Sequence, residues 1–72
     1  MIKHSLSLNA LIYDQKRILQ AVDAFKALAS IHVYLKDEYF MCFFEKCKYD
    51  LSITKKEFEN YVIDLMNVQH DN

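Results

Sequence analysis

The chain carries two kinds of hydrophobic repeat, and each predicts its own secondary structure. In "SLSLN", Leu6 and Leu8 alternate with Ser5 and Ser7, which is the two-residue period of a strand with one buried face. The same period returns in "IHVYLK", where one face carries Ile31, Val33 and Leu35 and the other carries His32, Tyr34 and Lys36. We therefore expect one strand near residues 4–9 and another over residues 31–36.

A helical period separates these two strands. Asp14 is a favourable N-cap residue, and Tyr13 and Ile18 have the spacing of a hydrophobic staple. The following residues place apolar side chains three and four positions apart, at Ile18, Ala21, Val22, Phe25, Leu28 and Ala29. This pattern predicts an amphipathic helix over residues 15–29.

The segment "ITKKEF" predicts the start of a second helix. Thr54 and Glu57 have the spacing of a capping box with Thr54 as the N-cap, and Ile53 and Phe58 have the spacing of a staple. An apolar stripe follows at Phe58, Tyr61, Val62, Leu65 and Met66. Ile63 lies off this stripe, so we expect its side chain to be exposed.

The third predicted strand has no polar face. Residues 39–44 read "YFMCFF", and only Asp37 and Glu38 separate them from the preceding strand. A two-residue hairpin loop pairs Lys36 with Tyr39, Leu35 with Phe40, Val33 with Cys42 and Ile31 with Phe44. Phe40, Cys42 and Phe44 then join the buried face beneath the helices, with Ile31, Val33 and Leu35. Tyr39, Met41 and Phe43 lie on the opposite face beside His32 and Tyr34.

The predicted order is β-α-β-β-α in a single small domain over residues 1–72. A right-handed crossover through the first helix makes the first two strands parallel, and the third strand fits between them. We therefore predict a two-layer α+β fold, a ferredoxin-like half with a three-stranded sheet and two helices on one face. The opposite face of the sheet is left without a covering layer.

This bare face is the predicted contact surface. Hydrophobic residues make up 53% of the chain, more than an interior of this size easily hides, and monomers rarely leave a large apolar patch open. The first strand also lies at a sheet edge, where backbone groups can accept an extended peptide or a second copy. The predicted partner-binding residues are His32, Tyr34, Tyr39, Met41, Phe43, Ser5 and Ser7.

Composition removes several classes of function. The chain contains neither Gly nor Pro, so it lacks the glycine-dependent phosphate loops and nucleophile elbows. The net charge is −1, which argues against nucleic acid. "DEYFMCFFEK" has aromatic residues like the central strand of an RNA-binding RRM domain, but it lacks the glycine and the basic residue of that pattern. We expect no nucleic-acid partner and no catalytic site.

Metal, redox and membrane functions also lack support in the sequence. His4, His32 and His70 lie in separate elements without neighbouring ligands, so we predict ordinary surface histidines and no metal or cofactor. Cys42 and Cys47 fit no CxxC pattern and are expected to be reduced thiols, Cys42 being buried. No leader sequence or apolar membrane span is apparent. We therefore expect a cytoplasmic protein without a membrane partner.

A wider pattern resembles a known family. "LSLNALIYDQKRILQAVDAF" places Tyr13 ahead of an Ala-rich helical segment ending in Phe25, an aliphatic hairpin follows, and "EFENYVIDLM" lies in the second helix. Across roughly residues 4–66 this pattern resembles HxsD, the small accessory protein of bacterial His-Xaa-Ser peptide-modification systems. Those proteins are encoded beside radical SAM enzymes and a His-Xaa-Ser repeat protein. The resemblance implies a non-catalytic partner of a maturase.

Two functions follow from these observations. The first is an accessory module that binds a radical SAM maturase or its substrate peptide through the aromatic face or the edge strand. The alternative is a self-associating structural protein or small inhibitor, a homodimer through the same face and unrelated to peptide maturation. Neither reading requires an enzyme activity.

Overall fold

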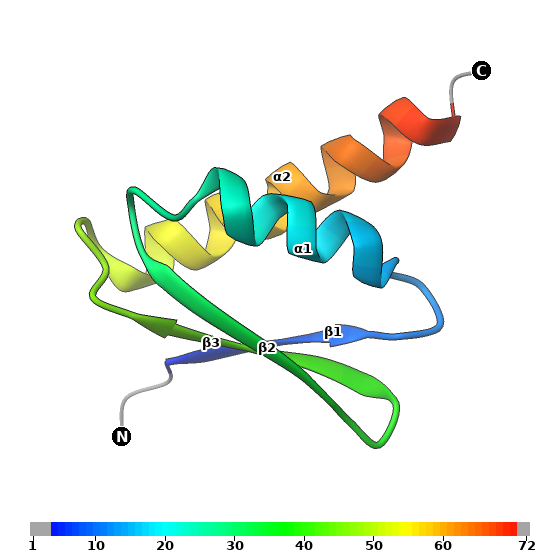
Figure 1. Cartoon of the computed structure of the whole chain (residues 1–72), viewed down its shortest axis with the longest axis horizontal. Helices are drawn as coiled ribbons and strands as arrows, with labels where there is room; N and C mark the ends of the chain where they lie inside the picture. The colour runs from blue at the N-terminus through cyan, green and yellow to red at the C-terminus, as the bar shows by residue number, and fades with distance from the viewer. Residues whose placement is uncertain (1–3, 71–72) are drawn as a thin grey trace.

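Five elements follow one another within the part of the chain that the computed structural model describes, residues 4–70, with side chains described as far as residue 67. They are β1 (Ser5–Asn9), α1 (Gln15–Ala24), β2 (Ser30–Lys36), β3 (Tyr39–Glu45) and α2 (Leu51–His70). Figure 1 shows the two helices lying together on one side of the sheet. The predicted β-α-β-β-α order and the two-layer α+β fold are confirmed.

The three strands form one sheet in the order β1-β3-β2, and both pairings are antiparallel. The hairpin register is the predicted one: Lys36 pairs with Tyr39, and Val33 pairs with Cys42. Asp37 has a positive φ of 58°, a conformation that aspartate tolerates better than most residues and that tight hairpin loops require. This register could be predicted because the loop length and the hydrophobic alternation both favour the same pairing of residues.

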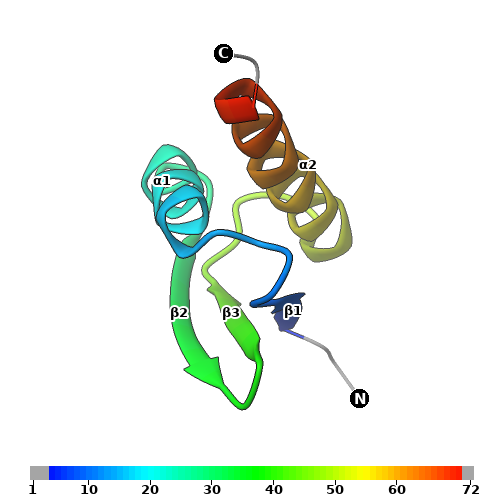
Figure 2. The ribbon, with the colours of Figure 1, turned by 90° about the vertical axis from the view of Figure 1, so that its right-hand side faces the viewer.

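The helices pack side by side over the inner face of the sheet. Figure 2 shows α1 above β2, with α2 beside it toward β1. The buried core combines both layers and consists of Leu8, Ile18, Ala21, Phe25, Ala29, Ile31, Phe40, Cys42, Phe44, Phe58 and Val62. Phe58 lies at its centre, because its ring meets those of Phe25 and Phe44 edge to face at centroid distances of 5.5 and 5.4 Å. Such pairs add to the stabilisation that comes from area burial alone.

The prediction that the first helix extends to residue 29 is wrong. Asp14 is the N-cap, as expected, but α1 ends at Ala24 and Phe25 is the C-cap residue. Beyond it the chain turns, with the Leu28 and Ala29 amides donating to the Phe25 carbonyl at 2.7 and 3.0 Å. Phe25 and Ala29 remain buried in these turns, so the apolar pattern continues past the helix and does not mark its end.

The predicted start of the second helix is also wrong. The α2 helix begins at Leu51, and Asp50 caps it by accepting hydrogen bonds from the Ile53 amide at 3.2 Å and the Ser52 hydroxyl at 2.8 Å. Thr54 instead lies inside the helix, buried, with its hydroxyl donating to the Asp50 carbonyl at 2.8 Å. Ile53 is exposed and does not act as a staple. Asp and Thr are both favourable N-cap residues. Here Asp50 is the cap, and Thr54 bonds through its hydroxyl to the backbone of the preceding turn.

The cap at Asp50 yields the first testable prediction. Its hydrogen bonds, first from the Ser52 side chain and then from the Ile53 amide, lower the pKa of the Asp50 carboxyl. The stabilisation is therefore present above the unfolded-state pKa and is lost as the pH falls through the lower folded-state pKa. Asp50→Ala should lower the urea midpoint at neutral pH, whereas Asp50→Asn, which keeps the capping oxygen, should lower it less. Equal midpoints for Asp50→Ala and the wild type would contradict the assigned cap.

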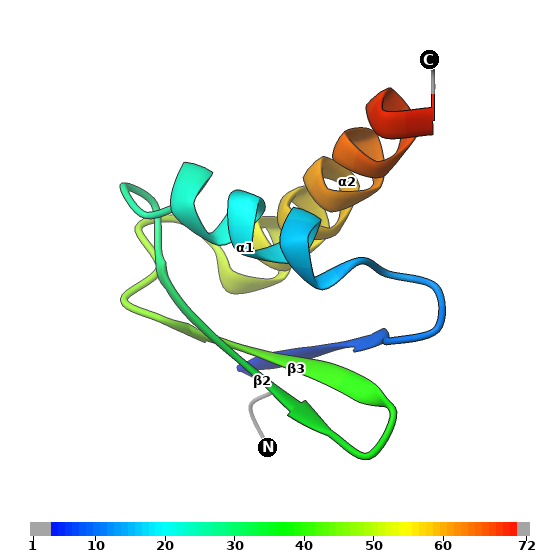
Figure 3. The ribbon, with the colours of Figure 1, turned by 45° about the vertical axis from the view of Figure 1, so that its right-hand side comes forward.

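The predicted burial of Leu35 beneath the helices is wrong. Leu35 pairs with Phe40 as expected, yet its side chain is 59% exposed. Figure 3 shows that the β2–β3 hairpin extends beyond the helices. Leu35 therefore projects from the correct face of the sheet but lies where no helix covers it. Periodicity assigns a side chain to a face of the sheet and does not show how far the covering layer reaches.

Candidate protein-binding surface

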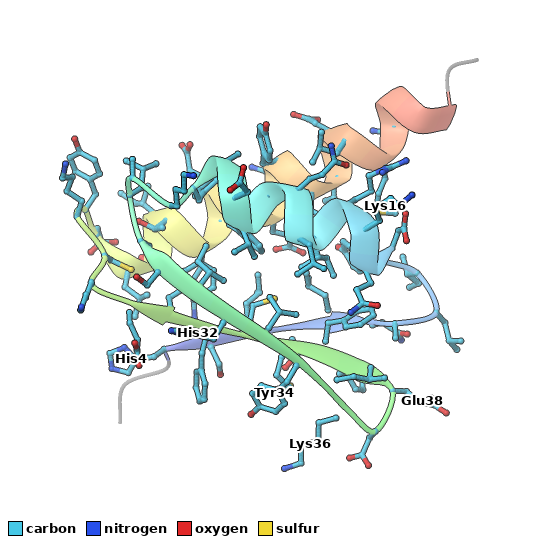
Figure 4. The ribbon with its side chains drawn as sticks, viewed as in Figure 1. His4, Lys16, His32, Tyr34, Lys36 and Glu38 are labelled. Carbon is cyan, nitrogen blue, oxygen red and sulfur yellow. The ribbon has the colours of Figure 1, made fainter. Side chains whose placement is uncertain are left out.

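The side of the sheet away from the helices carries the predicted contact residues. We call this surface the outer face, formed by Ser5, Ser7, His32, Tyr34, Tyr39, Met41 and Phe43. The strand register aligns them in rows across β1, β3 and β2: Ser5 beside Phe43 and then His32, Ser7 beside Met41 and then Tyr34. Figure 4 shows Tyr34 and Lys36 projecting on the side of the sheet opposite the helices. The structure thus brings all seven predicted residues onto one face.

The aromatic residues of the outer face are open to solvent. Tyr34, Tyr39 and Phe43 retain 45%, 45% and 43% exposure. The Tyr34 and Phe43 rings are neighbours, with centroids 6.2 Å apart and planes inclined by 55°. Met41 is half-buried, and the Ser7 hydroxyl donates to its sulfur at 3.4 Å. The result is a contiguous apolar surface bordered by the small side chains of β1.

Polar and charged side chains of β2 and of the end of β3 border the apolar centre of this surface. His32 Nε2 and Glu45 Oε1 are 3.4 Å apart, and both side chains are largely exposed. Lys36 follows at the hairpin end of the same strand. The centre of the outer face is therefore apolar while its border is polar, which is the usual anatomy of a protein interface.

A cavity of about 510 Å³ adjoins the outer face at Phe43. It lies where β3 ends and α2 begins, and its lining residues are His4, Phe43, Phe44, Glu45, Lys46, Cys47 and Leu51. The lining is mostly apolar, and the volume is sufficient for a large side chain of a partner. The sequence did not predict this cavity, because its walls come from three segments that no motif connects.

The β1 edge is less open than predicted. The Phe44 amide donates to the His4 carbonyl and the Ala10 amide to the Glu38 carbonyl, so by alternation Ser5, Ser7 and Asn9 direct their backbone groups away from β3. The Ser5 carbonyl accepts from Lys55 Nζ at 3.2 Å. The Asn9 carbonyl accepts from the Ile12 and Tyr13 amides at 3.0 and 2.8 Å. Two of the three outward carbonyls are thus already engaged.

Cys42 lies on β3, the strand of Met41 and Phe43, but on its opposite, buried face. Burial raises the pKa of the Cys42 thiol to about 12, so at neutral pH the reactive thiolate is scarcely populated. Both cysteines are free thiols. Among the described residues no three His, Cys, Asp or Glu side chains are grouped closely enough to hold a metal ion. His4 and His32 are exposed, and the His70 side chain lies outside the described residues.

A membrane-spanning role has no helix to support it within residues 4–70. Neither α1 nor α2 combines the length and the apolar character that a bilayer crossing requires. The α2 helix is long enough in residues, but its sequence mixes its apolar stripe with lysine and acidic residues.

Comparison with known proteins gives no relative to guide the interpretation. No family model, no curated protein and no solved structure matches this chain. The resemblance to HxsD therefore stays a prediction from the sequence.

Proposed function

We propose that the protein is a non-catalytic protein-binding module whose outer face docks a protein or peptide partner. The observation that carries this proposal is the contiguous apolar surface around Tyr34, Met41 and Phe43, which no other part of residues 4–70 covers. Exposed apolar patches bordered by polar residues are typical of interaction sites. Interface centres are enriched in aromatic residues and Met.

The resemblance to HxsD supplies the partner class for this proposal. The partner is then a radical SAM maturase or its substrate peptide, and the protein acts as an accessory in the bacterial cytoplasm. The cavity beside Phe43 supports a docking role, because it offers a recess for one anchoring side chain of the partner. A radical SAM gene next to the coding gene would support this proposal, whereas a phage or toxin neighbourhood would favour the structural or inhibitor alternative.

Replacing Met41 and Phe43 together by Ser tests the outer face directly. Each side chain lies near the centre of the surface, so losing both should weaken partner binding at least about a hundredfold, the scale of one to two interface hot spots. The measurement is fluorescence anisotropy with a labelled synthetic peptide of His-Xaa-Ser repeats and, separately, with the product of a radical SAM gene found beside the coding gene.

The matched control is Ile63→Ser, which removes an exposed apolar side chain on α2, in the helical layer. It should leave binding unchanged. Circular dichroism should show native helix content for both variants, because the outer face contributes little to the core. A folded Met41→Ser, Phe43→Ser protein that binds as tightly as the wild type would exclude the outer face as the docking site.

A further inference from the structure

The outer edge of β2 is open, in contrast with that of β1. Lys36 and Tyr39 are the pair that closes the two-residue loop, so their backbone groups hydrogen-bond to each other. By alternation, the even-numbered residues of β2 direct their backbone groups toward β3. Ile31, Val33 and Leu35 therefore direct their N–H and C=O groups away from the sheet. Within the described residues no bond from another element to these groups is present, and Figure 2 shows no element beyond β2 on that side. An open edge is a template for pairing with another chain.

We propose that β2 pairs with β2 of a second copy of this chain, antiparallel, with Val33 next to the two-fold axis. Antiparallel self-pairing is the arrangement that a two-fold symmetric dimer allows. In this register Val33 faces Val33 of the second copy, and His32 faces Tyr34. Ser30 at one end of the strand faces Lys36 of the second copy, and symmetry repeats each contact.

Charge complementarity favours a second copy as the occupant. Ser30 pairs with Glu45 of the same copy. If Lys36 of the second copy lies opposite Ser30, the Glu45 carboxylate is one strand beyond Ser30. Ser30 is small, and the long lysine side chain can extend over it toward Glu45. Each dimer then contains two such Lys36 and Glu45 pairs. An unrelated extended peptide would carry no such pattern in advance.

Apolar side chains beside this edge match in the same way. Leu35, 59% exposed at the uncovered end of the hairpin, would lie beside Ile31 of the second copy. On α1, Leu19 is 48% exposed and Val22 is half-buried. Both residues belong to α1, which lies above β2 in Figure 2. The two α1 helices would then be neighbours above the paired strands.

The dimer would contain one continuous six-stranded sheet with four helices on one side. Its two outer faces would join into a single surface, with His32 and Tyr34 of both copies at the centre. This inference is independent of what the outer face binds, since pairing uses the backbone of β2 and leaves the side chains of Met41 and Phe43 free.

The experiment measures dimerisation and the β2 amides together. Sedimentation should show a monomer–dimer equilibrium within about 1 µM to 1 mM, the range of weak to moderate specific association. In the same range, hydrogen exchange followed by NMR should show the Ile31, Val33 and Leu35 amides becoming protected as the concentration rises. A protein that stays monomeric throughout, or a dimer whose β2 amides remain unprotected, would overturn the proposal.

Two sets of variants locate the contact. Val33→Pro removes an outward donor and should weaken dimerisation about tenfold or more, whereas Ser7→Pro on the β1 edge should not. Lys36→Glu, on an exposed side chain, keeps the fold and should weaken the dimer about three- to tenfold, and adding Glu45→Lys should restore it. The proposal would be overturned if Lys36→Glu left dimerisation intact while Ser7→Pro, or Met41→Ser with Phe43→Ser, abolished it. The contact would then lie at the β1 edge or on the outer face.

Discussion

Phe58→Ala is expected to leave the domain largely unfolded in water at room temperature. The side chain is fully buried and its ring meets Phe25 from α1's end and Phe44 from β3, so its loss affects both layers. Truncating a buried Phe to Ala costs about 3–5 kcal/mol. A core of this size rarely supplies more than about 3–5 kcal/mol of net stability, so the two quantities nearly cancel.

Urea titration followed by circular dichroism measures this effect. Tyr61→Ala is the matched control. The Tyr61 ring on α2 also contacts the Phe25 ring, with centroids 5.7 Å apart, but its side chain remains partly exposed. Its midpoint should fall by much less than that of Phe58→Ala. A Phe58→Ala protein with a native spectrum and a near-wild-type midpoint would show that the aromatic cluster does not hold the layers together.

The Cys42 thiol should react about a thousandfold more slowly in the native protein than in the unfolded chain at pH 8. Burial between the sheet and the helices raises the pKa of this thiol to about 12, and only the thiolate attacks a disulfide reagent. The measurement is the rate with an aromatic disulfide reagent in a Cys47→Ala background, with and without urea. A native rate within about tenfold of the unfolded rate would contradict the burial of Cys42.

The same shift makes stability depend on pH in the alkaline range. The folded-state pKa lies above the unfolded value, so this contribution is complete below the unfolded pKa and declines as the pH rises toward about 12. The thiol alone should lower the free energy of unfolding by about 1.4 kcal/mol per pH unit above about pH 9. Cys42→Ala has no thiol to titrate at this position. The difference in pH dependence between the two proteins therefore separates the contribution of Cys42 from those of the tyrosines and lysines that titrate in the same pH range.

The sheet was the part of the fold that sequence reasoning could predict in detail. A loop of only two residues at Asp37 and Glu38 fixes which residues of β2 and β3 are opposite each other. The alternation of Leu6 and Leu8 with serine then determines which side of β1 faces the helices. Local constraint and burial agree here, so the candidate surface was assembled correctly from residues up to 38 positions apart.

The helix ends, the covered edge and the cavity were beyond such reasoning. Both Asp50 and Thr54 satisfy the rules for an N-cap, and only the packing of α2 decides between them. The contact from Lys55 to the Ser5 carbonyl joins residues 50 positions apart and leaves no trace in any local pattern. Leu35 was assigned to the correct face, but its exposure depends on where the helical layer stops.

The strand order also affects how the chain matures during synthesis. Because β1 pairs with β3 and not with β2, β1 has no partner in this sheet until Glu45 at the end of β3 has left the ribosome. The β2–β3 hairpin closes locally and early, whereas β1 waits for a contact of large sequence separation. During that interval the β1-facing edge of β3, around Cys42 and Phe44, is the apolar edge of the nascent chain that remains open to other proteins.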